Sequence, residues 1–166
     1  MENELLYEVD EHDRVVNSRS RGDLHRLGLR HRAVHILVCN HKGDVFLQKR
    51  AMSKDINPGL WDTSAAGHVD FGESYEESAR RELAEELGID PPERFEHLFK
   101  LPATATTGWE FIEVYRAVYE GTMTLQPTEI DRGEWLSPED IDRWLATGGE
   151  LTSSFCLIWQ RYREMT

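Results

Sequence analysis

The chain has 166 residues, of which 39% are hydrophobic, and this is enough for one domain with a core of its own. Its 19 basic residues are outnumbered by 31 acidic ones, and a net charge of −12 disfavours stable binding to a polymeric nucleic acid. A small anionic substrate stays compatible with this charge where a metal or local Arg and Lys residues attract it. No apolar run approaches the roughly 20 residues of a membrane-spanning helix, so no membrane partner is expected.

Short strands and turns are predicted in the first part of the chain. β-Branched and apolar residues predict strands at residues 4–9, 33–39 and 45–48. A turn at residues 10–14 follows the first strand, and Asn40–Gly43 predicts the hairpin turn between the other two. Residues 19–32 are unusually basic for this chain, and residues 51–66 are predicted to be irregular.

Helices and further strands are predicted in the rest of the chain. The helices are expected at residues 74–88, at 137–145, and from 153 or 154 to 162, and the strands at 95–101, 109–119 and 134–136. Ser74 and Glu77 have the spacing of a capping box, and Gly88 suits a helix C-terminus. Ser137 and Pro138 suit an N-cap and the first helical position. The order of these elements predicts a mixed sheet with helices on its faces.

The helix at residues 74–88 has a cluster of acidic residues. At 100° per residue, Glu82, Glu85 and Glu86 fall within an arc of roughly 100°. Like charges at this spacing destabilise an isolated helix by a few tenths of a kcal/mol per pair. A divalent cation such as Mg²⁺, which binds carboxylate oxygens, would offset that repulsion. An ordinary solvated helix face is the alternative interpretation of these three residues taken alone.

The surrounding residues resemble the Nudix box, G-x5-E-x7-R-E-U-x-E-E-x-G-U with U aliphatic. Every specified position is matched between Gly67 and Ile89. The resemblance implies an α/β (α+β) fold, the Nudix α/β/α sandwich, with a mixed β-sheet and a loop-helix-loop catalytic motif. It implies one domain over residues 1–166, with its core at about 30–145, an N-terminal strand and extension at 1–29, and a C-terminal helix at 150–166.

The resemblance also implies roles for residues of the box. The metal, Mg²⁺ or Mn²⁺, is expected to be bound by the Gly67 carbonyl and by Glu82, Glu85 and Glu86, with Glu85 and Glu86 as the surest ligands. Arg81 is expected to orient a carboxylate, and Glu73 to act less directly, through Arg81. A bound divalent ion neutralises a diphosphate and makes hydroxide available near neutral pH.

A second resemblance, from His31 to Gly72, is to the type 1 isopentenyl-diphosphate isomerases of the same superfamily. It rests on Leu47–Ala51, Pro58–Trp61 and the pair Gly67-His68, among other positions. His25, His31 and His68 resemble isomerase metal ligands, although ordinary surface or supporting histidines are the alternative for each. The isomerases require a cysteine where this chain has Ala66, so the resemblance implies a hydrolase related to the isomerases.

Three charged residues outside the box complete the predicted site. Arg50 and Lys54 follow a strand and are expected to hold substrate phosphate, with an ordinary exposed pair as the alternative. Glu113, on the strand at 109–119, is expected to serve as a general base or an additional metal ligand.

The predicted function is metal-dependent hydrolysis of the diphosphate linkage in a nucleoside diphosphate or a nucleoside diphosphate derivative. An isopentenyl-diphosphate isomerase-like enzyme and a non-catalytic nucleotide sensor are the alternatives. The expected partner is a small-molecule diphosphate, and the expected assembly is a monomer or homodimer. Cys39 and Cys156 lie in apolar runs and the N-terminal residues have no signal pattern, so a cytoplasmic location is expected.

Overall fold

The computed structural model describes residues 3–90 and 92–166, which form two sheets with helices around them. The strands are β1 (Leu5–Val9), β2 (Val15–Ser20), β3 (His31–Cys39), β4 (Val45–Arg50), β5 (Trp61–Asp62), β6 (Ala65–His68), β7 (Phe95–Leu101), β8 (Glu110–Val118) and β9 (Ile130–Leu136). The helices are α1 (Arg21–Leu27), α2 (Tyr75–Leu87), α3 (Pro138–Ala146) and α4 (Ser153–Met165).

The main sheet is mixed, as predicted. Its strand order is β5-β4-β3-β8-β7, with β6 paired to β3 and β9 paired to β4. β3 runs parallel to β8, with His31 opposite Glu110, and antiparallel to β4 and β6. A strand in this central position is covered on both faces, which explains why its run of β-branched residues is buried almost without interruption.

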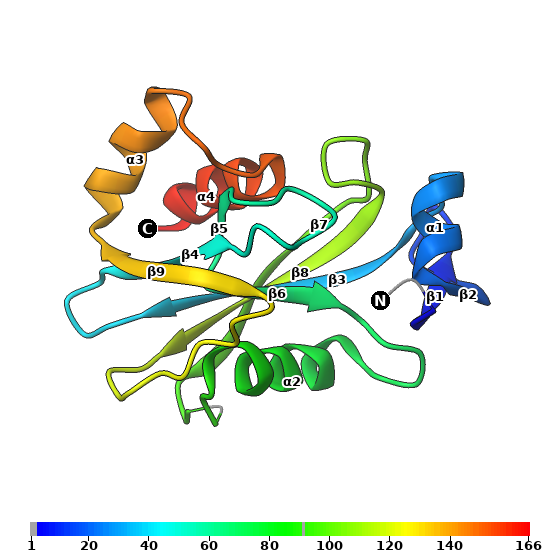
Figure 1. Ribbon diagram of the computed structural model, residues 1–166, viewed down its shortest axis with the longest axis horizontal. Helices are drawn as coiled ribbons and strands as arrows, with labels where there is room; N and C mark the ends of the chain where they lie inside the picture. Colours follow the sequence, from blue (N-terminus) through cyan, green and yellow to red (C-terminus); the bar gives the residue numbers. More distant parts are fainter. Residues whose placement is uncertain (1–2, 91) are drawn as a thin grey trace.

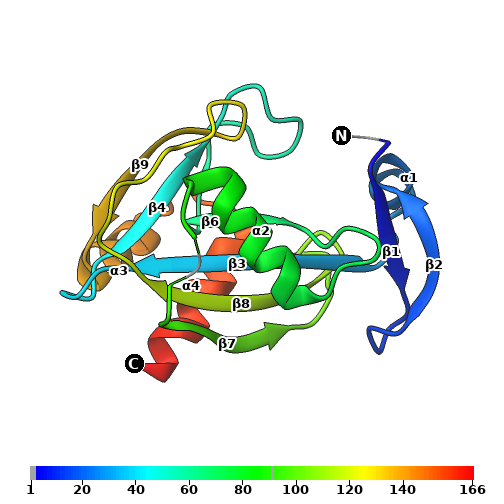
Figure 2. The ribbon, with the colours of Figure 1, turned by 90° about the horizontal axis from the view of Figure 1, so that it is seen from below.

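Helices cover both faces of the main sheet (Figures 1 and 2). α2 packs on one face through Ala79, Leu83 and Leu87, and α4 packs on the other through Phe155 and Trp159, with α3 beside it. Complete burial of each large apolar side chain contributes roughly 1.5–3 kcal/mol to stability. The predicted α/β/α sandwich and mixed sheet are therefore confirmed.

The local signals around α2 act as predicted. The Ser74 side chain accepts a hydrogen bond from the backbone N–H of Glu77, and the Glu77 side chain accepts one from the backbone N–H of Ser74. Gly88 adopts the left-handed conformation, with φ of 66°, and ends the helix. These caps fix the position of α2 along the chain and hence of the glutamates on it.

The N-terminal region contains more structure than the sequence patterns predict. β2 pairs with β1 in an antiparallel hairpin, and residues 21–27 of the basic stretch form α1, which Ser20 caps. Asp13, at the turn of the hairpin, accepts hydrogen bonds from Arg32 on β3 and from Tyr75 on α2. A seven-residue helix and an isolated hairpin are marginal in water, so contacts with the rest of the molecule stabilise both.

Three other expectations need correction. Residues 51–66 are not entirely irregular, because β5 and the start of β6 lie there and pair with β4 and β3. β9 begins at Ile130, before the predicted strand, because pairing with β4 extends it. α4 begins at Ser153, one of the two predicted starts, but continues to Met165 instead of ending at residue 162. Its N-cap is Thr152, whose hydroxyl accepts a hydrogen bond from the backbone N–H of Phe155 at 3.1 Å.

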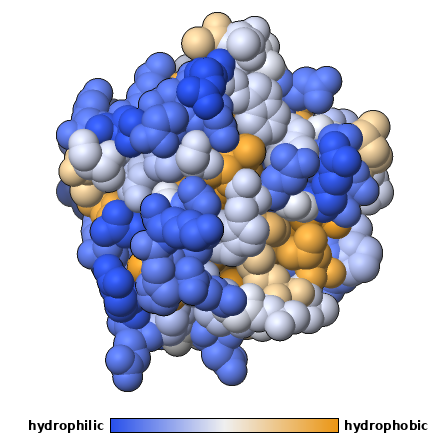
Figure 3. All heavy atoms as spheres, turned by 90° about the vertical axis from the view of Figure 1, so that its left-hand side faces the viewer, coloured by the Kyte–Doolittle hydropathy of each residue, from blue (hydrophilic) through white to orange (hydrophobic). Residues whose placement is uncertain are grey.

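The surface is largely hydrophilic on the side that Figure 3 shows, with apolar residues in small patches between charged ones. This is the distribution expected for a chain with a net charge of −12. Among the helices of the described residues, none is both long and apolar enough to cross a membrane.

Candidate active site

A cavity of about 570 Å³ gathers residues that lie far apart in the sequence. Its wall includes Gly67, Glu82 and Glu86 from the predicted motif, together with Arg50 and Lys54. Cavities of roughly 300–1,000 Å³ hold small-molecule ligands. The structure therefore places predicted metal ligands and predicted phosphate-binding residues around one space.

Glu82 and Glu86 lie one turn apart on α2 and are only 8% and 5% exposed. Burial raises the pKa of Glu82 to about 7. Burial, together with the negative charge of Glu82, raises the pKa of Glu86 well above its ordinary value. Both pKa shifts mean that the ionised forms of Glu82 and Glu86 are destabilised in the metal-free protein. A divalent cation bound between the two side chains would stabilise these ionised forms.

The strand β6 approaches both carboxyl groups closely. A Cβ atom at Gly67 would lie 2.2 Å from the carboxyl carbon of Glu82, which leaves no room for any other residue without movement of that side chain. The backbone N–H of Ala66 donates a hydrogen bond to Glu86 Oε1 at 3.1 Å. The glycine at the start of the motif is therefore required by the close approach of strand and helix.

Arg81 holds the surrounding carboxylates in place. Its guanidinium donates to both oxygens of Glu73, at 2.8 and 3.0 Å, and to Glu82 Oε1 at 2.7 Å. It also donates to Glu85 Oε2 at 3.3 Å and to the backbone carbonyl of His68 at 3.1 Å. The hydrogen bonds of Arg81 and Ser78 lower the pKa of Glu73 although burial opposes this, so Glu73 is ionised when it orients Arg81.

Four predicted site residues lie outside the wall of the cavity: Glu73, Arg81, Glu85 and Glu113. The side chain of Glu85 is 59% exposed and contacts Arg81 at the solvent edge of the helix. Glu113 lies on β8, and its Oε2 is 2.7 Å from Nε2 of His97 on the neighbouring strand β7. Successive residues of a strand point to opposite faces, so Glu113 and Glu110 project from opposite faces of β8. Glu110 is the one that lines the cavity.

Arg50 and Lys54 line the cavity and already have partners. The guanidinium of Arg50 donates to the carbonyl of Ile56 at 2.8 Å and so holds the loop between β4 and β5. The ammonium of Lys54 forms an ion pair with Glu129, another residue of the cavity wall. The negative charge of Glu129 also contributes to the raised pKa of Glu86, so the two carboxyl groups interact.

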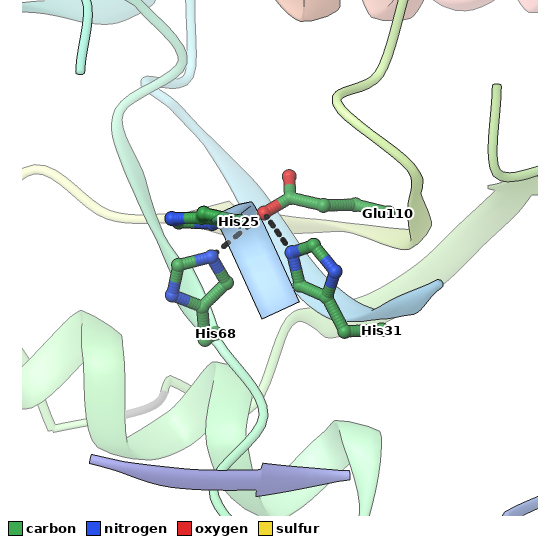
Figure 4. Close-up of side chains that lie close together, drawn as sticks. All are labelled: His25, His31, His68 and Glu110. Atoms are coloured by element: carbon green, nitrogen blue, oxygen red, sulfur yellow. Dashed lines mark ion pairs between the residues drawn. The ribbon is translucent and has the colours of Figure 1, made fainter. Parts of the chain in front are cut away.

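Three histidines and one glutamate converge at the end of the cavity near α1 (Figure 4). They are His25 on α1, His31 at the start of β3, His68 at the end of β6, and Glu110 at the start of β8. One ligand atom from each lies within 4.8 Å of the others. Nε2 of His68 and Nε2 of His31 lie 2.8 and 3.3 Å from Glu110 Oε2.

The protonation chemistry of this cluster suits a metal site. Nδ1 of His31 lies 2.8 Å from the carbonyl of Leu29, which makes Nδ1 the donor, so in the neutral ring Nε2 has a lone pair for a metal. Although burial opposes this, the Glu110 carboxylate raises the pKa of His31 when no metal is bound. Nε2 of His31 is buried and has no hydrogen-bond partner among the described residues. Burial and the neighbouring histidines lower the pKa of His25 to about 4, which keeps its ring neutral. Although burial opposes it, His31 and His68 lower the pKa of Glu110 well below its ordinary value.

Sequence patterns alone do not single out Glu110 or Glu129. Glu110 faces the histidines because β8 pairs with β3 in one particular parallel register. Glu129 lies in the loop before β9, and the backbone N–H of Ala51 donates to its carbonyl at 2.9 Å. Both placements depend on pairings between distant segments.

Comparisons with known proteins agree with the geometry. The family model described as NUDIX domain matches residues 29–155. An uncharacterized Nudix hydrolase of Yersinia pestis is 41% identical over 134 residues, which are 80% of this chain and 72% of that protein. The crystal structure of DR0079 from Deinococcus radiodurans has a TM-score of 0.85 and 32% sequence identity to this chain, and the match covers 95% of this chain and 98% of that one.

An isomerase is also among the similar proteins. Isopentenyl-diphosphate Delta-isomerase 2 of Photorhabdus laumondii is 45% identical over 89 residues, which are 54% of this chain and 50% of that protein. The likeness thus covers about half of each chain. The hydrolase relative from Yersinia pestis matches a longer part of the chain at similar identity.

Proposed function

Because the chain belongs to the NUDIX domain family, we propose that it is a divalent-metal-dependent hydrolase that cleaves the diphosphate linkage of a nucleoside diphosphate or a nucleoside diphosphate derivative. The observation that carries this proposal is the pair of buried carboxyl groups of Glu82 and Glu86 in the wall of a ligand-sized cavity. Two ionised groups buried this way are costly unless a cation compensates them.

The residues present fit Mg²⁺ or Mn²⁺. Glu82 and Glu86 would provide carboxylate oxygens, and the Gly67 carbonyl and Glu85 are the further expected ligands. When bound, the ion supplies charge neutralisation of phosphate oxygens and a water of lowered pKa. Arg81 acts before that step, because its hydrogen bonds to Glu73 and Glu82 hold the Glu82 carboxylate in one orientation.

Arg50 and Lys54 would position the diphosphate. Phosphoryl transfer depends mainly on alignment and charge neutralisation, and both cations line the same cavity as the carboxylates. A substrate phosphate would compete with Glu129 for the ammonium of Lys54. The Glu129 carboxylate released in this way would be the general base, and its position in the cavity wall favours it over Glu113, which pairs with His97.

The histidine cluster supports a second metal of different chemistry. Imidazole nitrogens suit Fe²⁺ or Zn²⁺ better than Mg²⁺, which takes oxygen ligands. His68 follows Gly67 directly, and its carbonyl accepts a hydrogen bond from Arg81, so the two candidate metal sites are adjacent. We propose that this site positions the substrate or orders β6, and that the glutamate site supports hydrolysis.

A substrate panel tests the proposal. Purified protein would be incubated with Mg²⁺ and with nucleoside diphosphates, dinucleoside polyphosphates, nucleotide sugars and isopentenyl diphosphate, and products would be identified by chromatography and phosphate release. We expect a nucleoside monophosphate as product, and loss of activity with a chelator. Isomerisation of isopentenyl diphosphate, or nucleotide binding without a product, would instead support one of the two alternative functions.

A further inference from the structure

We propose that the inner wall of the cavity selects substrates whose non-phosphate half carries hydrogen-bond donors, such as hydroxyl or amino groups, rather than an apolar chain. This inference rests on the proposed function and names the residues that would determine its substrate specificity. The wall consists of His35 on β3, Gln48 on β4 and Asp62 on β5, three polar side chains that line the cavity next to one another.

These three residues are almost fully enclosed by protein. His35, Gln48 and Asp62 are 5%, 3% and 4% exposed, yet each contributes to the cavity wall. An apolar chain lying against them would remove their remaining water without replacing its hydrogen bonds. Each unpaired group then weakens binding by roughly tenfold or more.

The hydrogen bonds of His35 identify which ring nitrogen remains for a ligand. Thr63 Oγ1 donates to the carbonyl of Ala65 at 3.3 Å, and His35 Nδ1 lies 2.8 Å from the same hydroxyl oxygen. With the Thr63 hydroxyl proton on the Ala65 carbonyl, Nδ1–H is the donor to Oγ1, and Asp62 Oδ1 at 3.7 Å from Nδ1 favours the same tautomer. In the neutral ring Nε2 is therefore an acceptor.

Asp62 and Gln48 also leave acceptors for a ligand. Asp62 Oδ1 accepts the backbone N–H of Thr63 at 2.7 Å, and its other oxygen, Oδ2, is 4.0 Å from the guanidinium of Arg50. Gln48 Nε2 donates to the carbonyl of Ser64 at 3.3 Å, which assigns Oε1 as the acceptor of that amide. The wall thus offers mainly acceptors, and donors on a substrate would satisfy them.

The wall is adjacent to the proposed hydrolytic centre. His35 lies directly opposite Ala66 in the pairing of β3 with β6, and the N–H of Ala66 binds Glu86. The neighbouring residues of the cavity wall, Ala33 and Ala66, have small side chains. A diphosphate at Glu82 and Glu86 would therefore place the group attached to it beside His35.

Binding measurements with matched ligands test the inference. The ligands are adenosine diphosphate, its 2′,3′-dideoxy analogue without hydroxyls, inosine diphosphate without the amino group, and isopentenyl diphosphate. Calorimetry with Ca²⁺ in place of Mg²⁺ slows turnover and measures affinity alone. We expect adenosine diphosphate to bind at least 100-fold more tightly than isopentenyl diphosphate. A loss with the dideoxy analogue or with inosine diphosphate identifies the hydroxyls or the amino group as the donor.

Variants identify the residues responsible. Asp62→Asn keeps the shape and the bond to Thr63 but replaces an acceptor with a donor, and His35→Phe removes the ring acceptor. Each variant should weaken the binding of adenosine diphosphate about tenfold or more and leave the affinity for isopentenyl diphosphate unchanged. His97→Phe, on β7 and outside the cavity wall, is the matched control and should change neither. If His35→Phe does not fold, Asp62→Asn alone tests the inference.

Several results would overturn the inference. These are equal affinity for isopentenyl diphosphate and the nucleotides, an equal loss for both ligands in Asp62→Asn, or no binding of any diphosphate. If adenosine diphosphate binds more tightly than isopentenyl diphosphate but no diphosphate is hydrolysed with Mg²⁺, the proposed function is refuted and the inference is sustained. Failure of the proposed function can therefore be distinguished from failure of the inference.

Discussion

Replacing Gly67 with alanine tests whether the close approach of β6 to α2 sets the position of the Glu82 carboxylate. A Cβ atom there would lie 2.2 Å from both the carboxyl carbon and Oε1 of Glu82, whereas ordinary contacts begin near 3.4 Å. The carboxylate must therefore move by about 1 Å. Metal ligands tolerate deviations of roughly 0.2 Å, and a misplacement of about 1 Å at an active site can reduce turnover about 100-fold.

The substitution should affect the site far more than the fold. The obstructing atoms belong to the end of a flexible side chain, and Gly67 does not have a left-handed backbone conformation that only glycine adopts easily. Alanine also lowers the entropy of the unfolded chain, which stabilises the protein by roughly 0.4–1 kcal/mol. We expect the free energy of unfolding to change by less than about 1 kcal/mol, with at least tenfold weaker Mg²⁺ or Mn²⁺ binding.

Three measurements on four proteins check this prediction. Metal affinity by calorimetry, hydrolysis of the best substrate and urea unfolding would be compared for the wild type, Gly67→Ala, Glu82→Ala and the double variant. If alanine at position 67 acts by displacing Glu82, it should have little further effect once Glu82 is truncated. Unchanged metal affinity and turnover in Gly67→Ala, or fully additive losses in the double variant, would refute the reasoning.

The remaining predictions concern the glutamates and their partners. Glu86→Gln should reduce turnover by at least 100-fold and retain the fold, as circular dichroism would show; full activity would exclude Glu86 as a metal ligand. Arg81→Lys should reduce turnover about tenfold or more, because one ammonium cannot replace the bonds to Glu73 and Glu82, and an unchanged rate would argue against this orienting role. The metal-free protein should become less stable as pH rises from 4.5 to about 7, since the folded state holds a proton on Glu82 that the unfolded state loses earlier. The resulting loss in the free energy of unfolding is at most on the order of 3 kcal/mol. Urea unfolding at several pH values should show that this free energy depends less on pH in Glu82→Gln than in the wild type. Lys54→Ala should raise KM more than it lowers kcat, because the ammonium binds substrate phosphate before and during the reaction, and an unchanged KM would contradict this role.

Local patterns were sufficient for much of the secondary structure. The capping box at Ser74 and the left-handed Gly88 involve residues only a few positions apart, so the limits of α2 follow from its own sequence. The same is true of β3, whose apolar run marks a central strand. β5 and α1 were not predicted, because a two-residue strand and a seven-residue helix depend on contacts with distant segments.

The family and the arrangement of the glutamates on α2 can be predicted from the chain alone, because helical periodicity and the spacing of the box are local properties. Which other groups face the cavity depends on long-range packing. The parallel register of β3 with β8 brings Glu110 rather than Glu113 to the histidines, and the loop before β9 brings Glu129 to Lys54. Such placements depend on how strands pair across long sequence separations, and no local pattern in the chain specifies that register.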